Sequence, residues 1–238
     1  MENTNQITAF TLAEVLITLM VIGILAMVTI PGIMQAWEER VTVSKLKETY
    51  STLQQAFKLA EIENGQPETW GFSYSNYSVT WDKMLPYLKT SQNCKLTAGG
   101  CAADGIKLLN EKPYININSD NTWYKFTLVS GVNIMSDRPS GQCTGSFYSD
   151  GQPSCFRLFV DINGLKGPNQ FGKDVFAFSM TKRGFIPWGG YHTPGDYMYH
   201  QNSCTGPDNI GSSIEGLGCA RWVIERGNMD YLHEVTTW

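Results

Sequence analysis

One segment of the sequence gathers side chains whose chemistry suits a hard metal ion. The run DINGLKGPNQFGKD, residues 161–174, combines carboxylate and amide groups with glycines. Calcium is bound by such oxygen ligands on flexible loops, and the ligands offered here are Asp161, Asn163, Asn169 and Asp174. The run departs from the EF-hand pattern, because its twelfth position is Gly172 instead of a glutamate. Asx-turns between two strands are the simpler interpretation. We therefore predict no cofactor, with calcium as the alternative.

Catalytic motifs are missing from the sequence. The three histidines, His192, His200 and His233, are scattered, and the sequence contains no GxSxG, no HExxH and no glycine-rich phosphate loop after a strand. An enzyme is therefore not predicted. The aromatic loop PWGGYHTPGDYMYH offers Tyr191 and Tyr197 as candidates for an adhesive or ligand-binding surface.

The six cysteines are the next reactive side chains. They are Cys94, Cys101, Cys143, Cys155, Cys204 and Cys219. An even number in a loop-rich domain favours disulfides formed outside the cytosol over zinc, because no CxxC pair occurs. Six cysteines allow about 15 connectivities. Nearest-neighbour pairing is favoured among them because each such pair encloses a turn-rich segment.

Length and charge limit the remaining classes of function. The chain has 238 residues and a net charge of −4, which leaves room for one anchor and one domain. No strongly basic block marks a nucleic-acid surface, so no nucleic-acid partner is predicted.

An apolar segment near the N-terminus has the length of a membrane span. From Phe10 to Ile30 the only charged residue is Glu14, and about 20 apolar residues cross a bilayer as a helix. A carboxylate at membrane depth usually has a partner and a function. The residues before Phe10 lack Lys and Arg, whereas basic residues follow the segment from Arg40 onward. This charge distribution alone would place the domain in the cytosol. The cysteines favour the opposite side.

The N-terminal sequence resembles that of a known family. The run AFTLAEVLITLMVIGILAMVTIP is similar to the cleavage and methylation segment of type IV pilins and type II secretion pseudopilins. In that family a leader is removed before a Phe, which becomes N-methylated, and a Glu stands four residues further on. Phe10 and Glu14 match these positions, as do the helix-loosening Gly23 and Pro31. Ala9 stands where the family usually has Gly.

The resemblance implies a function and a set of partners. It implies a precursor in the inner membrane that is cleaved by a prepilin peptidase, which is also an N-methyltransferase. The product would assemble with other pilin or pseudopilin subunits, on an inner-membrane platform, into a type IV pilus or a type II secretion pseudopilus. The alternative is a membrane-anchored adhesive or ligand-binding protein outside the cytoplasm.

Processing would give Glu14 a partner. Cleavage before Phe10 creates a cationic amine, and Glu14 lies one helical turn away on the same face. The amine can belong to the same subunit or to a neighbouring one. We therefore expect Glu14 to set the register between subunits during filament assembly.

The apolar segment is expected to continue as one long helix to about Glu63. Apolar side chains recur at intervals of three to five residues, and they are Met34, Trp37, Val41, Leu46, Tyr50, Leu53, Phe57 and Ala60. We expect this stripe to pack against the chain's own domain, with the sequence ENG ending the helix. Gly23 and Pro31 are expected to let the helix bend or open between them.

The remainder of the chain predicts an antiparallel sheet, which makes the fold α+β and pilin-like. Strands are expected in PYININ, in SCFRLFVDING, in DVFAFSMTKRGFIPW, and on both sides of Ser130-Gly131. The run WDKMLPYLK is expected to be partly helical. A short last strand is expected in RWVI, beside a Cys204–Cys219 loop that serves as a staple or as a surface for partners. The predicted parts are a leader (1–9), an assembly helix (10–31), an amphipathic helix (32–65) and an extracytoplasmic domain (66–238).

Overall fold

The computed structural model describes residues 11–73, 78–137, 139, 143–144, 148–149, 152–189 and 203–234. It divides into two compact units, Met1–Val41 and Thr42–Trp238. Within them a long apolar helix leads into an antiparallel sheet domain with three disulfides. This confirms the predicted α+β class.

The first element, α1, is one helix from Leu12 to Asn64. It continues through Gly23 and Pro31, and the expectation that this part of the helix can bend or open when a subunit leaves the bilayer stays a prediction. The helix ends at Gly65, whose positive φ of 79° is the left-handed conformation that commonly stops helices. The predicted stop at ENG is therefore confirmed.

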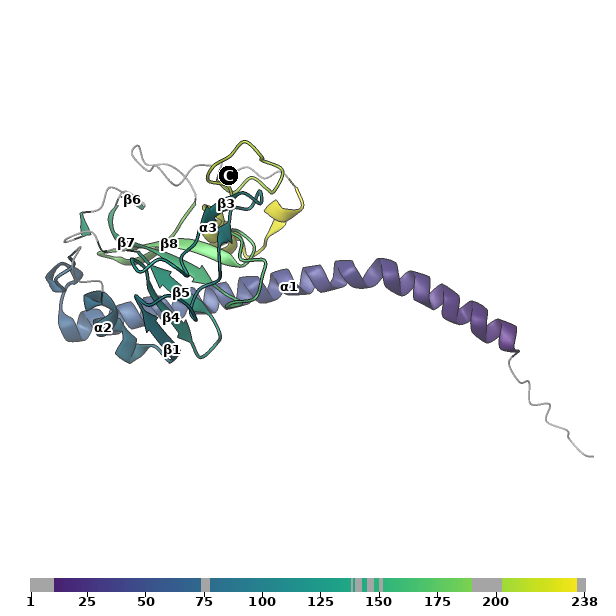
Figure 1. Ribbon diagram of the computed structural model, residues 1–238, viewed down its shortest axis with the longest axis horizontal. Helices are drawn as coiled ribbons and strands as arrows, with labels where there is room; N and C mark the ends of the chain where they lie inside the picture. Colours follow the sequence, from purple (N-terminus) through teal and green to yellow (C-terminus); the bar gives the residue numbers. More distant parts are fainter. Residues whose placement is uncertain are drawn as a thin grey trace, which may run out of the picture. The chain divides into compact units, whose positions relative to one another are not determined.

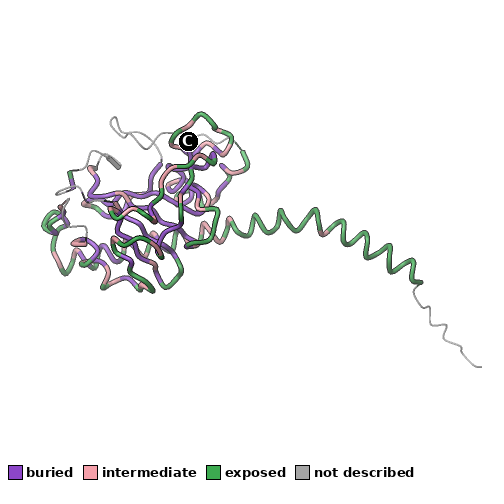
Figure 2. Tube along the Cα trace, viewed as in Figure 1, coloured by how far each residue is buried: buried purple, intermediate pink, exposed green. Residues whose placement is uncertain are grey.

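The second half of α1 packs on the domain through the predicted stripe. Leu46, Leu53 and Phe57 are fully buried, and Phe57 contacts the rings of Trp70 and Phe185. The stripe does not extend toward the N-terminus, because Trp37 is 65% exposed. Figure 2 shows this change from exposed to buried residues along the helix.

The sheet has the strand order β1-β4-β5-β7-β8-β9, with all neighbours antiparallel (Figure 1). The strands are β1 (Thr90–Lys95), β4 (Tyr124–Leu128), β5 (Asn133–Ser136), β7 (Gln152–Asp161), β8 (Val175–Thr181) and β9 (Gly184–Pro187). A short β6 (Tyr148–Ser149) pairs with β7, while β2 (Ile106–Lys107) and β3 (Pro113–Ile115) form a separate pair. The predicted hairpin around Ser130-Gly131 is the one that joins β4 to β5.

The sheet buries both of its faces. Along β7, Phe156, Leu158 and Val160 belong to the core that includes α1. The intervening Phe159 belongs to a second core on the other face, together with Trp123 and other residues from the loops. This alternation is the two-residue period of a strand. The loops therefore form a third layer.

The edge of the sheet at β9 is closed by α1. The side-chain amide of Gln54 accepts a hydrogen bond from the Phe185 N–H (3.3 Å) and donates one to the Phe185 carbonyl (2.6 Å). Gly184 has a φ of 118°, which L side chains rarely adopt, and a Cβ there would displace the Gln54 amide from these bonds, so glycine is favoured at this position. Satisfied edge groups protect a sheet from pairing with another chain.

Short helices complete the fold. They are η1 (Pro67–Thr69), α2 (Val79–Met84), η2 (Leu85–Tyr87), α3 (Cys219–Arg226) and η4 (Asp230–Leu232). The predicted strand in RWVI is wrong, because these residues lie in α3. Gly227 ends that helix in the left-handed conformation and donates to the Val223 carbonyl. The prediction for PYININ holds only for Pro113–Ile115.

Candidate functional site

The start of α1 positions Glu14. Thr11 donates to Glu14 Oε2 from its backbone N–H (2.8 Å) and from its hydroxyl (2.8 Å). In return the Glu14 N–H donates to the Thr11 hydroxyl oxygen (3.3 Å). This reciprocal arrangement is a capping box, whose sequence signature is Thr or Ser followed three residues later by Glu. The run TLAE carries that signature, so the cap has a signal in the sequence that can be recognised before the structure is known. Ala9 and Phe10, the predicted processing site, lie outside the described residues.

The helix beyond this cap presents a continuous apolar surface. Its exposed large side chains are Leu12, Val15, Leu16, Ile17, Leu19, Met20, Val21, Ile22, Ile24, Leu25, Met27, Val28, Ile30, Ile33, Met34 and Trp37. Soluble monomers rarely expose so much contiguous apolar area. The helix is long and apolar enough to cross a membrane, which is compatible with a membrane anchor or a signal sequence.

The segment 161–174 is the second candidate site, and the β7–β8 hairpin positions it. Asp161 is the last residue of β7, and Asp174 immediately precedes β8. The ladder holds these ends together, because Asp161 pairs with Val175 and the Ile162 N–H donates to the Asp174 carbonyl (2.9 Å). Both aspartates are almost fully buried.

Hydrogen bonds hold the Asp174 carboxylate firmly. It accepts from the backbone N–H of Asn169 (2.8 Å) and of Gln170 (2.6 Å), and from the Asn163 side-chain amide (3.2 Å). The Asp161 carboxylate accepts from the Asn163 N–H through Oδ1 (3.3 Å). An Asx-turn of the predicted kind is therefore present at Asp161.

Several buried oxygens of this segment accept no hydrogen bond from the turns. Asp161 Oδ2, Asn163 Oδ1 and Asn169 Oδ1 are buried and have no hydrogen-bond partner among the described residues. Buried polar atoms of native proteins are usually paired, so each exception needs a physical explanation. Burial and the nearby charge of Asp174 raise the pKa of Asp161 to about 8. Burial also raises the pKa of Asp174. The segment is thus an acidic, oxygen-lined site with unused acceptors.

The chemistry of this donor set suits a hard cation. Carboxylate and amide oxygens are the ligands of calcium, and a cation would neutralise both aspartates and pair with the unused acceptors. The described residues contain no group of three or more His, Cys, Asp or Glu side chains that could hold a metal. The site therefore depends on asparagine oxygens as well as on its two carboxylates.

The disulfides follow the nearest-neighbour pairing. They join Cys94 to Cys101, Cys143 to Cys155, and Cys204 to Cys219. The structure thereby confirms the expected disulfides.

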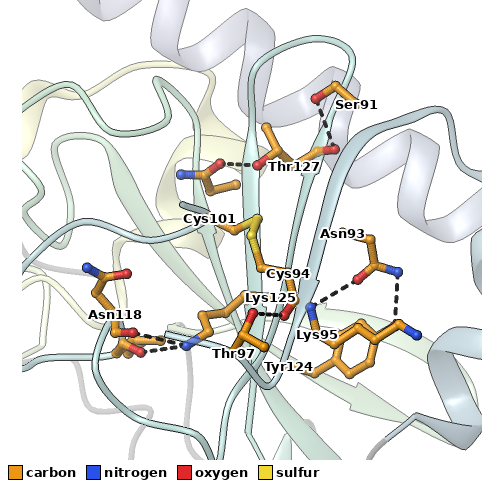
Figure 3. Close-up of a disulfide and its surroundings, with 12 residues drawn as sticks. Ser91, Asn93, Cys94, Lys95, Thr97, Cys101, Asn118, Tyr124, Lys125 and Thr127 are labelled. Carbon is orange, nitrogen blue, oxygen red and sulfur yellow. Dashed lines mark hydrogen bonds between the residues drawn. A yellow bond between two sulfur atoms is a disulfide. The ribbon is translucent and has the colours of Figure 1, made fainter. Parts of the chain in front are cut away.

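A buried lysine lies beside the first disulfide (Figure 3). Lys125 Nζ donates to the carbonyls of Ile117 (3.0 Å), Asn118 (3.3 Å) and Asp120 (3.0 Å). Burial lowers the pKa of Lys125. Its ammonium ties β4 to the loop before it, a role that residue type and spacing did not reveal.

Of the histidines and the two loop tyrosines considered in the sequence, only His233 lies within the described residues. His192, His200, Tyr191 and Tyr197 lie outside the described residues. His233 follows η4 at the C-terminal end of the domain.

Fold and sites together define an α+β protein with a long apolar N-terminal helix, an antiparallel sheet and three disulfides. Residues 32–204 match a family described as a family of unknown function (DUF6613), and the chain belongs to that family. The match includes the oxygen-lined segment and begins within α1, at residue 32. No curated protein and no solved structure matches the chain.

Proposed function

We propose that this protein is a pilin-like structural subunit, processed by a prepilin peptidase and assembled into a type IV pilus or type II secretion pseudopilus. One observation carries the proposal: the exposed apolar surface of α1 begins with a capped acidic turn and continues into a half that packs on the domain. The resemblance of residues 9–31 to the prepilin segment supports it. The function is mechanical, and no enzymatic activity is proposed.

The helix suits two apolar environments. Before assembly, lipid would cover the side chains from Leu12 to Met34. In a filament, the equivalent helices of neighbouring subunits would cover them. The second half of α1 is already buried against the sheet, so the domain would remain folded during the transfer. The closed edge at β9 is consistent with assembly through helices instead of strand addition.

Processing provides the first test. The full-length protein is purified from membranes of its native host and analysed by intact mass and N-terminal sequencing. A chain that begins with N-methylated Phe10 supports the proposal, and an Ala9→Gly variant should be processed at least as completely. A chain that still begins at Met1 contradicts it.

The alternative is a membrane-anchored adhesive or ligand-binding protein. Its candidate residues, Tyr191 and Tyr197, lie outside the described residues. Loss of binding with normal filaments after mutation of these tyrosines would favour an added binding role. An unprocessed chain would favour this alternative as a whole.

We further propose that the segment 161–174 binds calcium. The support is the set of unused buried oxygens on Asp161, Asn163 and Asn169, together with two buried carboxylates. These residues and Asp174 would hold the ion. The ion would neutralise the carboxylates and brace the end of β7 against the start of β8.

Calorimetry tests the calcium proposal on the full-length protein in detergent. Calcium is titrated into the EDTA-treated and dialysed protein and into an Asp161→Asn variant, with Asp82→Asn as the control, because Asp82 is an exposed residue of α2. We expect binding to the wild type and the control, and weaker binding by at least about tenfold when a carboxylate ligand is removed. Absence of heat at millimolar calcium would eliminate this site.

A further inference from the structure

The oxygen-lined segment 161–174 lies directly against the loop closed by the Cys204–Cys219 disulfide. A Cβ placed on Gly172 would lie 3.1 Å from Cys219 Sγ. A Cβ placed on Gly216 would lie 2.5 Å from the Phe171 carbonyl oxygen. Glycine on both sides therefore lets the two backbones touch, so that neither segment can move far without the other.

Hydrogen bonds connect the same two segments. The Gln170 side-chain amide donates to the carbonyls of Leu108 (2.9 Å) and Leu109 (2.8 Å). The Leu109 N–H in turn donates to the Glu215 carbonyl in the disulfide loop (3.0 Å). Tyr231 in η4, which lies outside both segments, also donates its hydroxyl to the Gly172 carbonyl (2.7 Å). Gln170 begins this series of hydrogen bonds, and its backbone N–H donates to the Asp174 carboxylate.

The disulfide loop is itself tightly held and its sulfurs are inaccessible. The buried Glu215 carboxylate accepts from the Thr205 N–H (2.6 Å), the Thr205 hydroxyl (3.0 Å) and the Asn209 amide (3.1 Å). Cys204 is 1% exposed and Cys219 is 0% exposed. A thiol reagent can therefore reach this disulfide only after the loop opens.

We infer that the segment 161–174 and the disulfide loop 204–219 open as one cooperative unit, so that a cation held by the first protects the disulfide of the second. Shared backbone contacts and the connected hydrogen bonds make separate opening unfavourable. A cation that binds only the closed form raises the free energy of opening. The cation arm of this inference rests on the calcium site proposed above, whereas the joint opening does not.

The experiment measures the reduction rate of each disulfide. The full-length protein is treated with excess dithiothreitol, whose two thiols reduce one disulfide and become a cyclic disulfide. Free cysteines are then alkylated and located by mass spectrometry. The Cys94–Cys101 disulfide serves as an internal reference, because it joins residues at the β1 end of the sheet.

A matched pair of variants perturbs the oxygen-lined segment in EDTA. Gly164 has a φ of 76° and a Cβ there would lie 2.9 Å from the Gly131 carbonyl, whereas Gly71 has a φ of 78° with open space around it. Both alanine variants force a left-handed residue, but only Gly164→Ala does so in the coupled unit. We expect Gly164→Ala to speed reduction of Cys204–Cys219 by about 5- to 30-fold, and Gly71→Ala to leave it unchanged.

Adding calcium tests the inference by stabilising the closed form instead of destabilising it. At a concentration about 100 times its dissociation constant, calcium should slow reduction of Cys204–Cys219 by about 100-fold and leave Cys94–Cys101 unchanged. The inference would be overturned if Cys204–Cys219 were reduced at the same rate in Gly164→Ala and Gly71→Ala. It would also be overturned if calcium bound without slowing the reduction of this disulfide. Absence of calcium binding would refute only the calcium site, because the variant pair still decides whether the segments open together.

Discussion

The two buried aspartates make a sharp prediction about pH. Without a cation, burial and the charge of Asp174 raise the pKa of Asp161 to about 8, from the model-compound value of 3.8. The folded state therefore binds a proton at pH values where the unfolded chain has lost it. The contribution of Asp161 to stability is fully present below about pH 4 and is lost as the pH rises to about 8.

The size of this effect follows from the shift. A pKa difference of about 4 units corresponds to a loss on the order of 5 kcal/mol in the free energy of unfolding across that range. Asp174 acts in the same direction, because burial also raises its pKa. Calcium would offset the loss by pairing with the ionised carboxylates, so the difference between calcium and EDTA should grow with pH.

Urea unfolding followed by tryptophan fluorescence measures this dependence on the full-length protein in detergent. In EDTA, we expect the urea concentration at the unfolding midpoint to be lower at pH 8.5 than at pH 4.5. The Asp161→Asn substitution should remove most of this decrease. Asp82→Asn, which changes an exposed carboxylate, should behave as the wild type. Equal wild-type midpoints at the two pH values in EDTA would refute the electrostatic argument.

Three further substitutions test the fold and the helix cap. Lys125→Met leaves three backbone carbonyls without their charged donor, so unfolding in urea should require about 3 kcal/mol less free energy. Gly184→Ala forces a side chain at a φ of 118° and displaces the Gln54 amide from Phe185, so we expect a loss of about 2 to 4 kcal/mol, against about 1 to 2 kcal/mol for Gly71→Ala, which has only the backbone strain. Thr11→Val removes the capping hydroxyl and should weaken amide protection in the first turn of α1 by about 1 kcal/mol in hydrogen exchange, whereas Thr11→Ser should retain it.

Much of the fold could be predicted from local patterns. The β-rich run SCFRLFVDING, ended by turn residues, and the Ser130-Gly131 turn each specify strands that one sequence window contains. The prediction of a strand in RWVI is wrong because three consecutive apolar, β-prone residues after an arginine do not distinguish a strand from a buried helix. The helix is explained by Gly227, which ends it, and by burial of Cys219, Ala220, Trp222 and Val223.

The candidate sites also combine features that the local sequence predicts with features that only the tertiary structure shows. Asp161, Asn163, Asn169 and Asp174 could be grouped from the sequence because they lie within one loop. The oxygens that lack a hydrogen-bond partner could not be predicted, because hydrogen bonding depends on how that loop folds. Lys125 and its three carbonyl partners depend on tertiary packing. The contact between Gly172 and Cys219 joins residues far apart in the chain and has no local signal.

The capping box gives the Glu14 carboxylate a role that does not require a neighbouring subunit. A carboxylate in the first turn already has partners in Thr11 and a favourable place at the helix N-terminus. That place is at the end of the apolar segment, so a spanning helix would keep Glu14 near the bilayer surface. The pairing proposed with a Phe10 amine must therefore be separated from capping.

Two substitutions of Glu14 make that separation. Gln at this position of a capping box also accepts the cap hydrogen bonds but carries no charge. If subunit register depends on the charge, Glu14→Gln should abolish filaments, while hydrogen exchange in the first turn of α1 stays normal. Glu14→Ala should abolish filaments and also weaken that exchange protection. Normal filaments from Glu14→Gln would show that capping alone is the role of Glu14, and the charge pairing would have to be abandoned.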